Sequence, residues 1–455
     1  MSSLPCGNPY QQHPESIELP PKRFFGILRR IGPGLILTSS VVGSGELIAT
    51  TLLGAENGYT LLSLILLSCT IKIVVQNKLG RYTIGTGETT LEAFDRSPGP
   101  RLHVSWIIWL WFLVVTLSFF SIGGMMGGIS EVLHTLFSRV SFSQWLWIIN
   151  IFTATLLVIG RYSLVERIAV AMVTTFTVLT VACAFLLSKN PQYFSWKSVL
   201  QGLSFHRPRG GLMTAVTVFG STGVGAIELT SYPYWCIEKG YARFTGSWEN
   251  SSSWRARATG WIKVMGTDVL SSWLIYTLAT VAFYFLGAGI LSGLGLLPKG
   301  PDMVRTLSKM FTETLGDWSF YLFLIGSLAV LYSTVFSGIA ALSRMLTDFI
   351  GMFGFYDRRN YTVRLRVIRI SAVILPLLPT LLFLFVQEPV FMIKVSGVSQ
   401  ALLLPAIGTS TLYLHYVHLP KDVLTKRWLT VALWLTTLIM TVLMGYSVIH
   451  ELSRW

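Results

Sequence analysis

Two carboxylates within otherwise apolar segments are the residues of this sequence best suited to bind a cation. Glu46 follows Gly43-Ser44-Gly45, and Glu228 follows a second glycine-rich run, Gly220 to Gly225. Glycine costs about 1 kcal/mol relative to alanine inside a helix, so each run predicts an interrupted helix. An ionisable side chain at membrane depth is a candidate functional residue because an unpaired charge there is costly. We therefore expect Glu46 and Glu228 to meet in one central site.

The interrupted helices also offer neutral ligands. A helix end leaves backbone N–H or C=O groups without an intrahelical partner, so we expect the backbone near Gly43, Ser44 and Gly45, and near Gly225 and Ala226, to contribute to the site. Gln400 is the side-chain oxygen predicted from a later segment, with Ser396 and Gly397 as competing positions.

The predicted metal ligands are therefore Glu46, Glu228 and Gln400. Such hard oxygen ligands suit Mg²⁺, Ca²⁺ or Mn²⁺, and Mg²⁺ would keep part of its water. Alternatively, the two carboxylates could hold an organic cation, or one of them could carry a proton.

The elements that position these residues are long apolar segments. The chain has 455 residues, of which 52% are hydrophobic and 12% are charged, against about 25% charged in soluble proteins. About 20 apolar residues cross a bilayer. Eleven such segments lie near 34–56, 59–79, 104–128, 144–160, 164–187, 212–236, 262–290, 318–344, 367–386, 390–414 and 428–450. They predict an all-α integral membrane protein, preceded by a disordered cytoplasmic tail at 1–30.

The two glycine-glutamate patterns lie in spans 1 and 6, which are five spans apart and so run in opposite directions. This spacing predicts two inverted repeats of five spans, at about 31–187 and 212–414, with an extra helix at about 428–450. The whole of 31–455 is then one transporter domain whose helices 1 and 6 are broken. Discontinuous helices in corresponding halves are typical of secondary transporters, which bind substrate near the membrane midplane.

The basic residues indicate the orientation. With the N-terminus inside, 24 of the 35 Lys and Arg residues lie on the inner side and nine on the outer side. Cytoplasmic loops carry this excess, so we predict a cytoplasmic N-terminus, an external C-terminus and a plasma (inner) membrane location. The net charge of +14 is then a topology signal and not evidence of nucleic-acid binding. The expected partners are a small cation and the lipid bilayer.

Several classes of protein are not indicated. The four cysteines lie far apart without CxxC spacing, so neither a disulfide framework nor a zinc site is expected. No phosphate-binding loop or catalytic motif is present, so we expect neither an enzyme nor an ATP-driven pump, and no cofactor beyond the cation.

Four other sets of charged residues lie in or near the predicted spans. Lys72, inside span 2, is either a snorkelling or paired lysine or an internal countercharge to a glutamate. Lys394 is expected to snorkel to the interface, and Asp268 is either structural or a proton relay. Arg344 and Asp348, four residues apart, predict an ion pair on one helix face.

Five segments carry a resemblance to a known family. They are Ile31-Gly-Pro-Gly34, Gly54-Ala-Glu-Asn-Gly-Tyr59, Leu79-Gly-Arg-Tyr-Thr83 with Thr89-Thr-Leu-Glu-Ala93, Gly326–Asp348 with Ser333-Thr334, and Ser399-Gln400 through Leu404-Pro405. Through them the chain resembles a divergent member of the Nramp divalent-metal transporters over most of 30–450. The resemblance implies the leucine-transporter fold, with spans 1 and 6 forming the metal site.

The site residues depart from that family's pattern. Gly43-Ser44-Gly45-Glu46 stands where the family has Asp-Pro-Gly-Asn, and Leu229-Thr230-Ser231 stands at its Met-Pro-His. Alignment with the family therefore adds Leu229 and Thr230 to the predicted substrate-binding residues. Ile122 and Met125 occupy the places of the acidic pair linked to proton movement in span 3, which implies altered or absent proton coupling.

Three functions remain open from the sequence. The first is a secondary transporter for a divalent metal cation, and the second is an amino acid or organic amine transporter, in which backbone amides at Gly43-Ser44-Gly45 would bind a carboxylate. The third is a membrane scaffold or sensor that does not transport.

Overall fold

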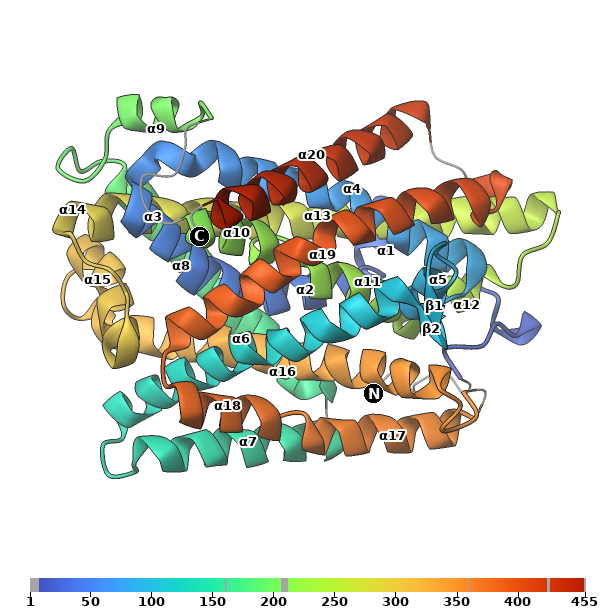
Figure 1. Cartoon of the computed structure of the whole chain (residues 1–455), viewed down its shortest axis with the longest axis horizontal. Coiled ribbons are helices and arrows are strands. Elements are labelled where there is room, and N and C mark those ends of the chain that lie inside the picture. The colour runs from blue at the N-terminus through green and yellow to red at the C-terminus, as the bar shows by residue number, and fades with distance from the viewer. Residues whose placement is uncertain (1–7, 160–161, 206–211, 359, 424–425, 454–455) are drawn as a thin grey trace.

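The computed structural model is a bundle of long helices that run roughly along its longest axis (Figure 1). The structure describes residues 8–159, 162–205, 212–358, 360–423 and 426–453. The short elements α9 (Trp196–Gly202), α14 (Ser292–Leu294) and α15 (Met303–Leu315) gather at one end of the bundle. At the other end lie α5 (Thr90–Asp95), α12 (Tyr241–Thr245) and the antiparallel strands β1 (Arg101–Leu102) and β2 (Val104–Ser105).

Each predicted span lies on a helical stretch. Span 1 is α2 (Pro33–Val41), η2 (Val42–Thr50) and α3 (Thr51–Asn57), and after η3 (Gly58–Leu61) span 2 is α4 (Leu62–Thr86). Spans 3 to 5 are α6 (Trp106–Leu136), α7 (Phe142–Ile159) and α8 (Tyr162–Leu187). Span 6 is α10 (Leu212–Ser221) with α11 (Ala226–Lys239), and span 7 is α13 (Ser252–Leu286), which continues into η4 (Gly287–Leu291). Spans 8 to 11 are α16 (Ser319–Met352), α17 (Tyr361–Ile374) with α18 (Leu377–Val386), α19 (Pro389–Val417) and α20 (Arg427–Leu452).

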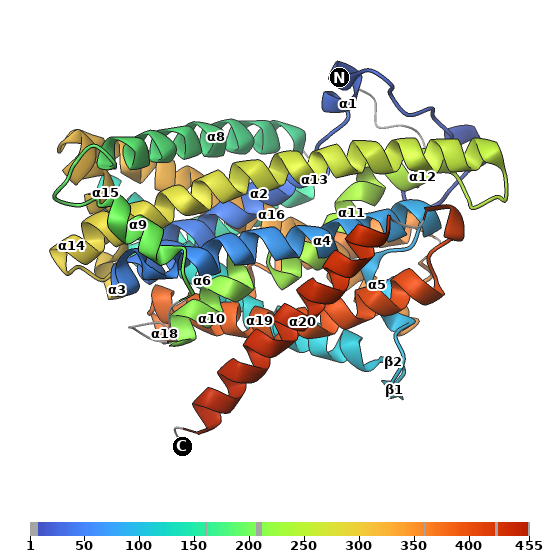
Figure 2. The same cartoon turned by 90° about the horizontal axis from the view of Figure 1, so that it is seen from above.

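Nine stretches among the described residues are long and apolar enough to cross a membrane. One of them, Pro33–Thr86, contains both of the first two predicted spans. The last helix, α20, crosses the side of the bundle obliquely, and its C-terminal end points away from the other helices (Figure 2).

Span 1 differs from the prediction of a broken helix. Its glycines fall inside a π-helical segment, Val42–Thr50, that joins α2 to α3 without non-helical backbone. A π-helix keeps backbone hydrogen bonds, with i→i+5 spacing. The amides at Gly43 and Gly45 are therefore part of a widened helix and are not presented as free donors.

Span 6 is broken as predicted. Residues 222–225 are non-helical and separate α10 from α11. Gly223 adopts φ +66°, a left-handed conformation that favours glycine. Gly225 is the N-cap of α11, so the break places the first turn of a new helix inside the bundle.

The N-terminal segment also differs from the predicted disorder. From residue 8 onward it lies against the bundle: Glu18 N–H donates to the Phe244 carbonyl at 3.1 Å, and the Trp261 indole donates to the Glu18 carbonyl at 2.9 Å. Its Tyr10 hydroxyl donates to Glu238 at 3.0 Å. Apolar and polar contacts across several helices therefore order a segment whose composition indicates a free tail; residues 1–7 lie outside the described part.

Candidate functional site

A small pocket adjoins the break in span 6. Its cavity is about 50 Å³, which exceeds the roughly 10–15 Å³ needed for one water. Its lining includes one carboxylate, Glu228 from the first turn of α11, and one amide, Gln400 from α19. The remaining lining residues are Ser40, Ser44, Ser118, Ser121, Ile122, Met125, Ile227, Thr334, Gly338, Leu342 and Ser396.

Glu228 and Gln400 converge above Gly225. A Cβ atom at Gly225 would lie 2.5 Å from Oε2 of Glu228 and 2.6 Å from Oε1 of Gln400. The Gln400 oxygen also accepts the N–H of Ile227 at 3.4 Å, and its amide nitrogen donates to the Ser396 hydroxyl at 3.4 Å. A side chain at this position would therefore displace the two oxygens.

The chemistry of the pocket is that of oxygen donors around one carboxylate. Six hydroxyl-bearing residues contribute, from η2, α2, α6, α16 and α19. Ile122 and Met125, the residues at the family's acidic positions in span 3, form an apolar part of the wall. Among the described residues there is no group of three or more His, Cys, Asp or Glu side chains placed to hold a metal ion. A cation here would bind one carboxylate, neutral oxygens and water.

Glu46 does not line this pocket. Its side chain is fully buried, and Oε1 accepts the N–H of Gly223 at 2.9 Å and the hydroxyl of Thr280 at 3.0 Å. The other oxygen, Oε2, is buried without a hydrogen-bond partner. Of the two carboxylates that we expected to share one site, Glu228 lines this pocket, whereas Glu46 binds the backbone of the break.

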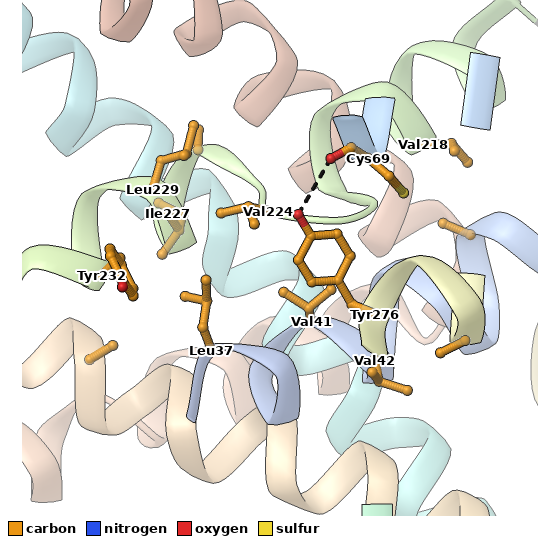
Figure 3. Close-up of a cluster of buried hydrophobic side chains, with 14 of the residues drawn as sticks. Leu37, Val41, Val42, Cys69, Val218, Val224, Ile227, Leu229, Tyr232 and Tyr276 are labelled. Carbon is orange, nitrogen blue, oxygen red and sulfur yellow. Dashed lines mark hydrogen bonds between the residues drawn. The ribbon is translucent and has the colours of Figure 1, made fainter. Parts of the chain in front are cut away.

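Lys72 contacts the same backbone. Its side chain is fully buried in α4, and Nζ donates to the Thr222 carbonyl at 2.7 Å. Val224, in the same break, belongs to a cluster of buried apolar side chains that also includes Leu37, Val41 and Tyr276 (Figure 3).

The other predicted residues have packing roles. Gly43 faces Thr334, and a Cβ at Gly45 would lie 2.8 Å from the Ser221 carbonyl. Leu229 is fully buried in the core, and the Thr230 hydroxyl donates to the Ile227 carbonyl at 2.8 Å. Of the positions predicted for side-chain contact with substrate, Ser44, Glu228 and Gln400 line the pocket, and the competing position Ser396 does so as well.

Four hydroxyl-bearing residues that line the pocket were not predicted from the sequence: Ser40, Ser118, Ser121 and Thr334. Ser118 and Ser121 are three residues apart in α6, a spacing that places both on one helix face, and this was the signal that could have found them. Ser40 and Thr334 carry no such signal, since isolated hydroxyls are common in membrane helices.

The remaining charged residues stabilise the scaffold. Asp268 accepts the N–H groups of Gly32 at 2.8 Å and Gly34 at 2.6 Å, at the start of α2. Lys394 pairs with Glu56 at 3.2 Å, so it does not simply snorkel.

The predicted pair between Arg344 and Asp348 is wrong. Arg344 pairs with Glu238 at 2.6 Å, and Asp348 pairs with Arg364 at 2.6 Å. Arg344 and Asp348 each face an opposite charge on a neighbouring helix, Glu238 of α11 and Arg364 of α17, in place of each other.

A bundle of long apolar helices around a discontinuous helix and a central polar pocket defines an integral, multi-pass membrane protein of the transporter class. The family model described as natural resistance-associated macrophage protein-like, or Nramp, matches residues 34–450. The chain therefore belongs to the Nramp family.

Comparison with solved structures supports the same fold. The Eremococcus coleocola manganese transporter in complex with an aromatic bis-isothiourea compound has a TM-score of 0.68 and 18% identity, covering 95% of this chain and 88% of that one. MhsT in complex with L-phenylalanine has a TM-score of 0.58 and 16% identity, covering 95% and 99%. Inward-facing Mhp1 has a TM-score of 0.53 and 15% identity, covering 91% and 90%.

One curated relative matches part of the chain. The uncharacterized protein PM0681 of Pasteurella multocida is 26% identical over 163 residues, which is 35% of this chain and 36% of that protein. The match thus spans about a third of the relative's length.

Proposed function

We propose that this Nramp-family protein is a secondary transporter of a divalent metal cation, Mn²⁺, Mg²⁺ or Ca²⁺, in the plasma (inner) membrane. The observation that carries the proposal is the convergence of Glu228 Oε2 and Gln400 Oε1 above Gly225 in a pocket of hydroxyl groups. Carboxylate, carbonyl and water oxygens suit these hard cations. Family membership and the fold shared with a manganese transporter support the same class of substrate.

The proposed ligands are narrower than the predicted set. Glu228 supplies the charge, Gln400 and hydroxyls such as that of Ser44 supply neutral oxygens, and Glu46 acts outside the pocket on the break. A single carboxylate leaves part of the cation's charge unbalanced, so we expect the cation to keep several waters and to bind weakly. Proton coupling would have to differ from a mechanism that uses acids in span 3, where Ile122 and Met125 stand.

Uptake into proteoliposomes tests the proposal. We expect the protein to accumulate at least one of Mn²⁺, Mg²⁺ and Ca²⁺ above protein-free vesicles. Glu228→Gln should lower the initial rate at least tenfold, because Glu228 is the one carboxylate among the described residues that line the pocket. The matched control is Glu313→Gln, a partly exposed residue of α15 that pairs with Lys309. Equal uptake by Glu228→Gln and the control would exclude this site.

An organic amine is the second candidate substrate. The apolar wall formed by Ile122, Met125 and Leu342 beside one carboxylate favours it, because an ammonium group with a hydrocarbon body needs both surfaces. A thermal-shift screen separates the candidates: stabilisation by amines but by none of the three metals would favour amine transport.

A further inference from the structure

The peptide group between Thr222 and Gly223 is held at both ends by buried charges. Its carbonyl accepts from Lys72 Nζ at 2.7 Å, and its N–H donates to Glu46 Oε1 at 2.9 Å. The C=O and N–H of a trans peptide point in opposite directions within one plane, so the ammonium and the carboxylate lie at opposite edges of this peptide group. Both side chains are fully buried.

The surroundings of the ammonium are those of a cation site. The carbonyl that it contacts stands at the C-terminal end of α10, where the helix dipole favours positive charge. The Phe219 ring lies 5.4 Å from Nζ, within the range of a cation–π contact. The hydroxyl of Ser68, one turn before Lys72 on α4, donates to the Phe219 and Thr222 carbonyls at 3.4 Å each.

Neither charge could be buried alone at low cost. Breaking a buried pair by removing one partner is strongly destabilising, because the other charge is left without compensation. The charges of Glu46 and Lys72 sum to zero. The peptide between them turns its negative carbonyl end towards the ammonium and its positive N–H end towards the carboxylate, so its dipole stabilises both charges. Oε2 of Glu46 remains without a hydrogen-bond partner, so the carboxylate's balance depends on the lysine across the peptide.

We propose that the carbonyl end of α10 is a monovalent-cation site that the chain fills with its own Lys72 ammonium. The tethered ammonium orients the Thr222–Gly223 peptide and leaves no place there for a free ion. The Thr50 hydroxyl, 2.8 Å from that of Thr222, ties the same residue to span 1. The ammonium thereby acts as a positioning group for the break that carries Glu228, three residues beyond Gly225.

The test removes the ammonium and offers a soluble replacement. The purified full-length Lys72→Ala variant is melted in methylammonium, sodium or choline chloride at equal ionic strength. We expect its Tm in choline to lie about 3–5 °C below that of the wild type, and methylammonium to restore at least half of this loss. The wild type and Lys394→Ala, which removes an ammonium from the part-buried pair with Glu56, should not distinguish methylammonium from choline.

The Glu46→Gln/Lys72→Ala double variant tests the charge balance, and it should lose the methylammonium response. If Lys72→Ala yields no folded protein, recovery of folded protein in the double variant supports the proposal, and equal loss in both contradicts it. A folded Lys72→Ala variant that is as stable as the wild type, or destabilised without any response to methylammonium, also contradicts it. These measurements do not depend on transport, so their outcome does not depend on which substrate the protein carries.

Discussion

At the scale of single residues, two glutamates that each follow a glycine-rich run make different contacts. Glu228 faces a pocket with Gln400, whereas Glu46 accepts hydrogen bonds from Gly223 and Thr280. Because Glu228 lines the pocket and Glu46 does not, the geometry favours Glu228 as the substrate ligand.

Gly225→Ala tests this convergence without altering any charge. The backbone of Gly225 has φ −73° and ψ 176°, which alanine adopts freely, so the fold should persist. Its Cβ would meet Glu228 Oε2 and Gln400 Oε1 at 2.5 and 2.6 Å, so both side chains must move. We expect the apparent affinity for the transported cation to fall at least tenfold in uptake assays.

Gly445→Ala is the control for that experiment, since nothing lies within 4 Å of a Cβ at this position in α20. An affinity that falls equally in both variants would show that the effect does not come from the pocket.

At the scale of elements, side chains near the helix ends attach the short segments to the long helices. Glu131, near the end of α6, accepts the N–H of Val304 in the first turn of α15 at 2.9 Å. Its place at the start of α15, outside the lining of the pocket, indicates a cap and not a proton carrier. At the other end of the bundle, Tyr10 docks the N-terminal segment.

Glu131→Ala should therefore loosen α15 alone. Loss of an N-terminal cap costs about 0.5–2 kcal/mol. Hydrogen–deuterium exchange of Met303–Leu315 should accelerate by about threefold to thirtyfold, while exchange in α4 stays unchanged. Unchanged exchange in α15 would show that the contact contributes no stability.

Tyr10→Ala tests the docking of the N-terminal segment. The Arg364 guanidinium lies 3.5 Å from the Tyr10 ring centroid, and burial, followed by the charge of Glu238, raises the pKa of the Tyr10 phenol well above its ordinary value. The phenol thus stays a neutral donor to Glu238. Loss of the ring and this hydrogen bond should lower Tm by about 2–3 °C.

Tyr10→Phe keeps the ring over Arg364 and should lose less than half of that amount. Equal Tm values for the wild type and Tyr10→Ala would show that residues 8–23 dock without stabilising the bundle.

At the scale of the whole molecule, the ends of the bundle carry different elements. The docked N-terminal segment, α5 and α12 lie at one end, and α14 and α15 at the other (Figure 1). The excess of Lys and Arg falls in loops of the first end, as the positive-inside rule requires of the cytoplasmic side.

Reporter fusions test this orientation in cells. Alkaline phosphatase fused after Trp455 should be active, and green fluorescent protein fused at the same place should be dark, because the predicted cytoplasmic N-terminus and eleven predicted spans would place the C-terminus outside. The opposite pattern would require either an even number of spans or an inverted protein.

The sequence by itself determined the membrane class, the helical segments, the break in span 6 and the family. Each of these follows from the residues of one segment: long apolar runs form spans, glycine clusters interrupt a helix, and short motifs identify the family. Only the tertiary structure decided which carboxylate faces the pocket. The π-helical segment at Val42–Thr50 has more residues per turn than an α-helix. It therefore rotates the side chains within it and after it in span 1, and changes the direction in which Glu46 points. That direction, like the position of Lys72 across one peptide group, depends on how helices distant in sequence pack together.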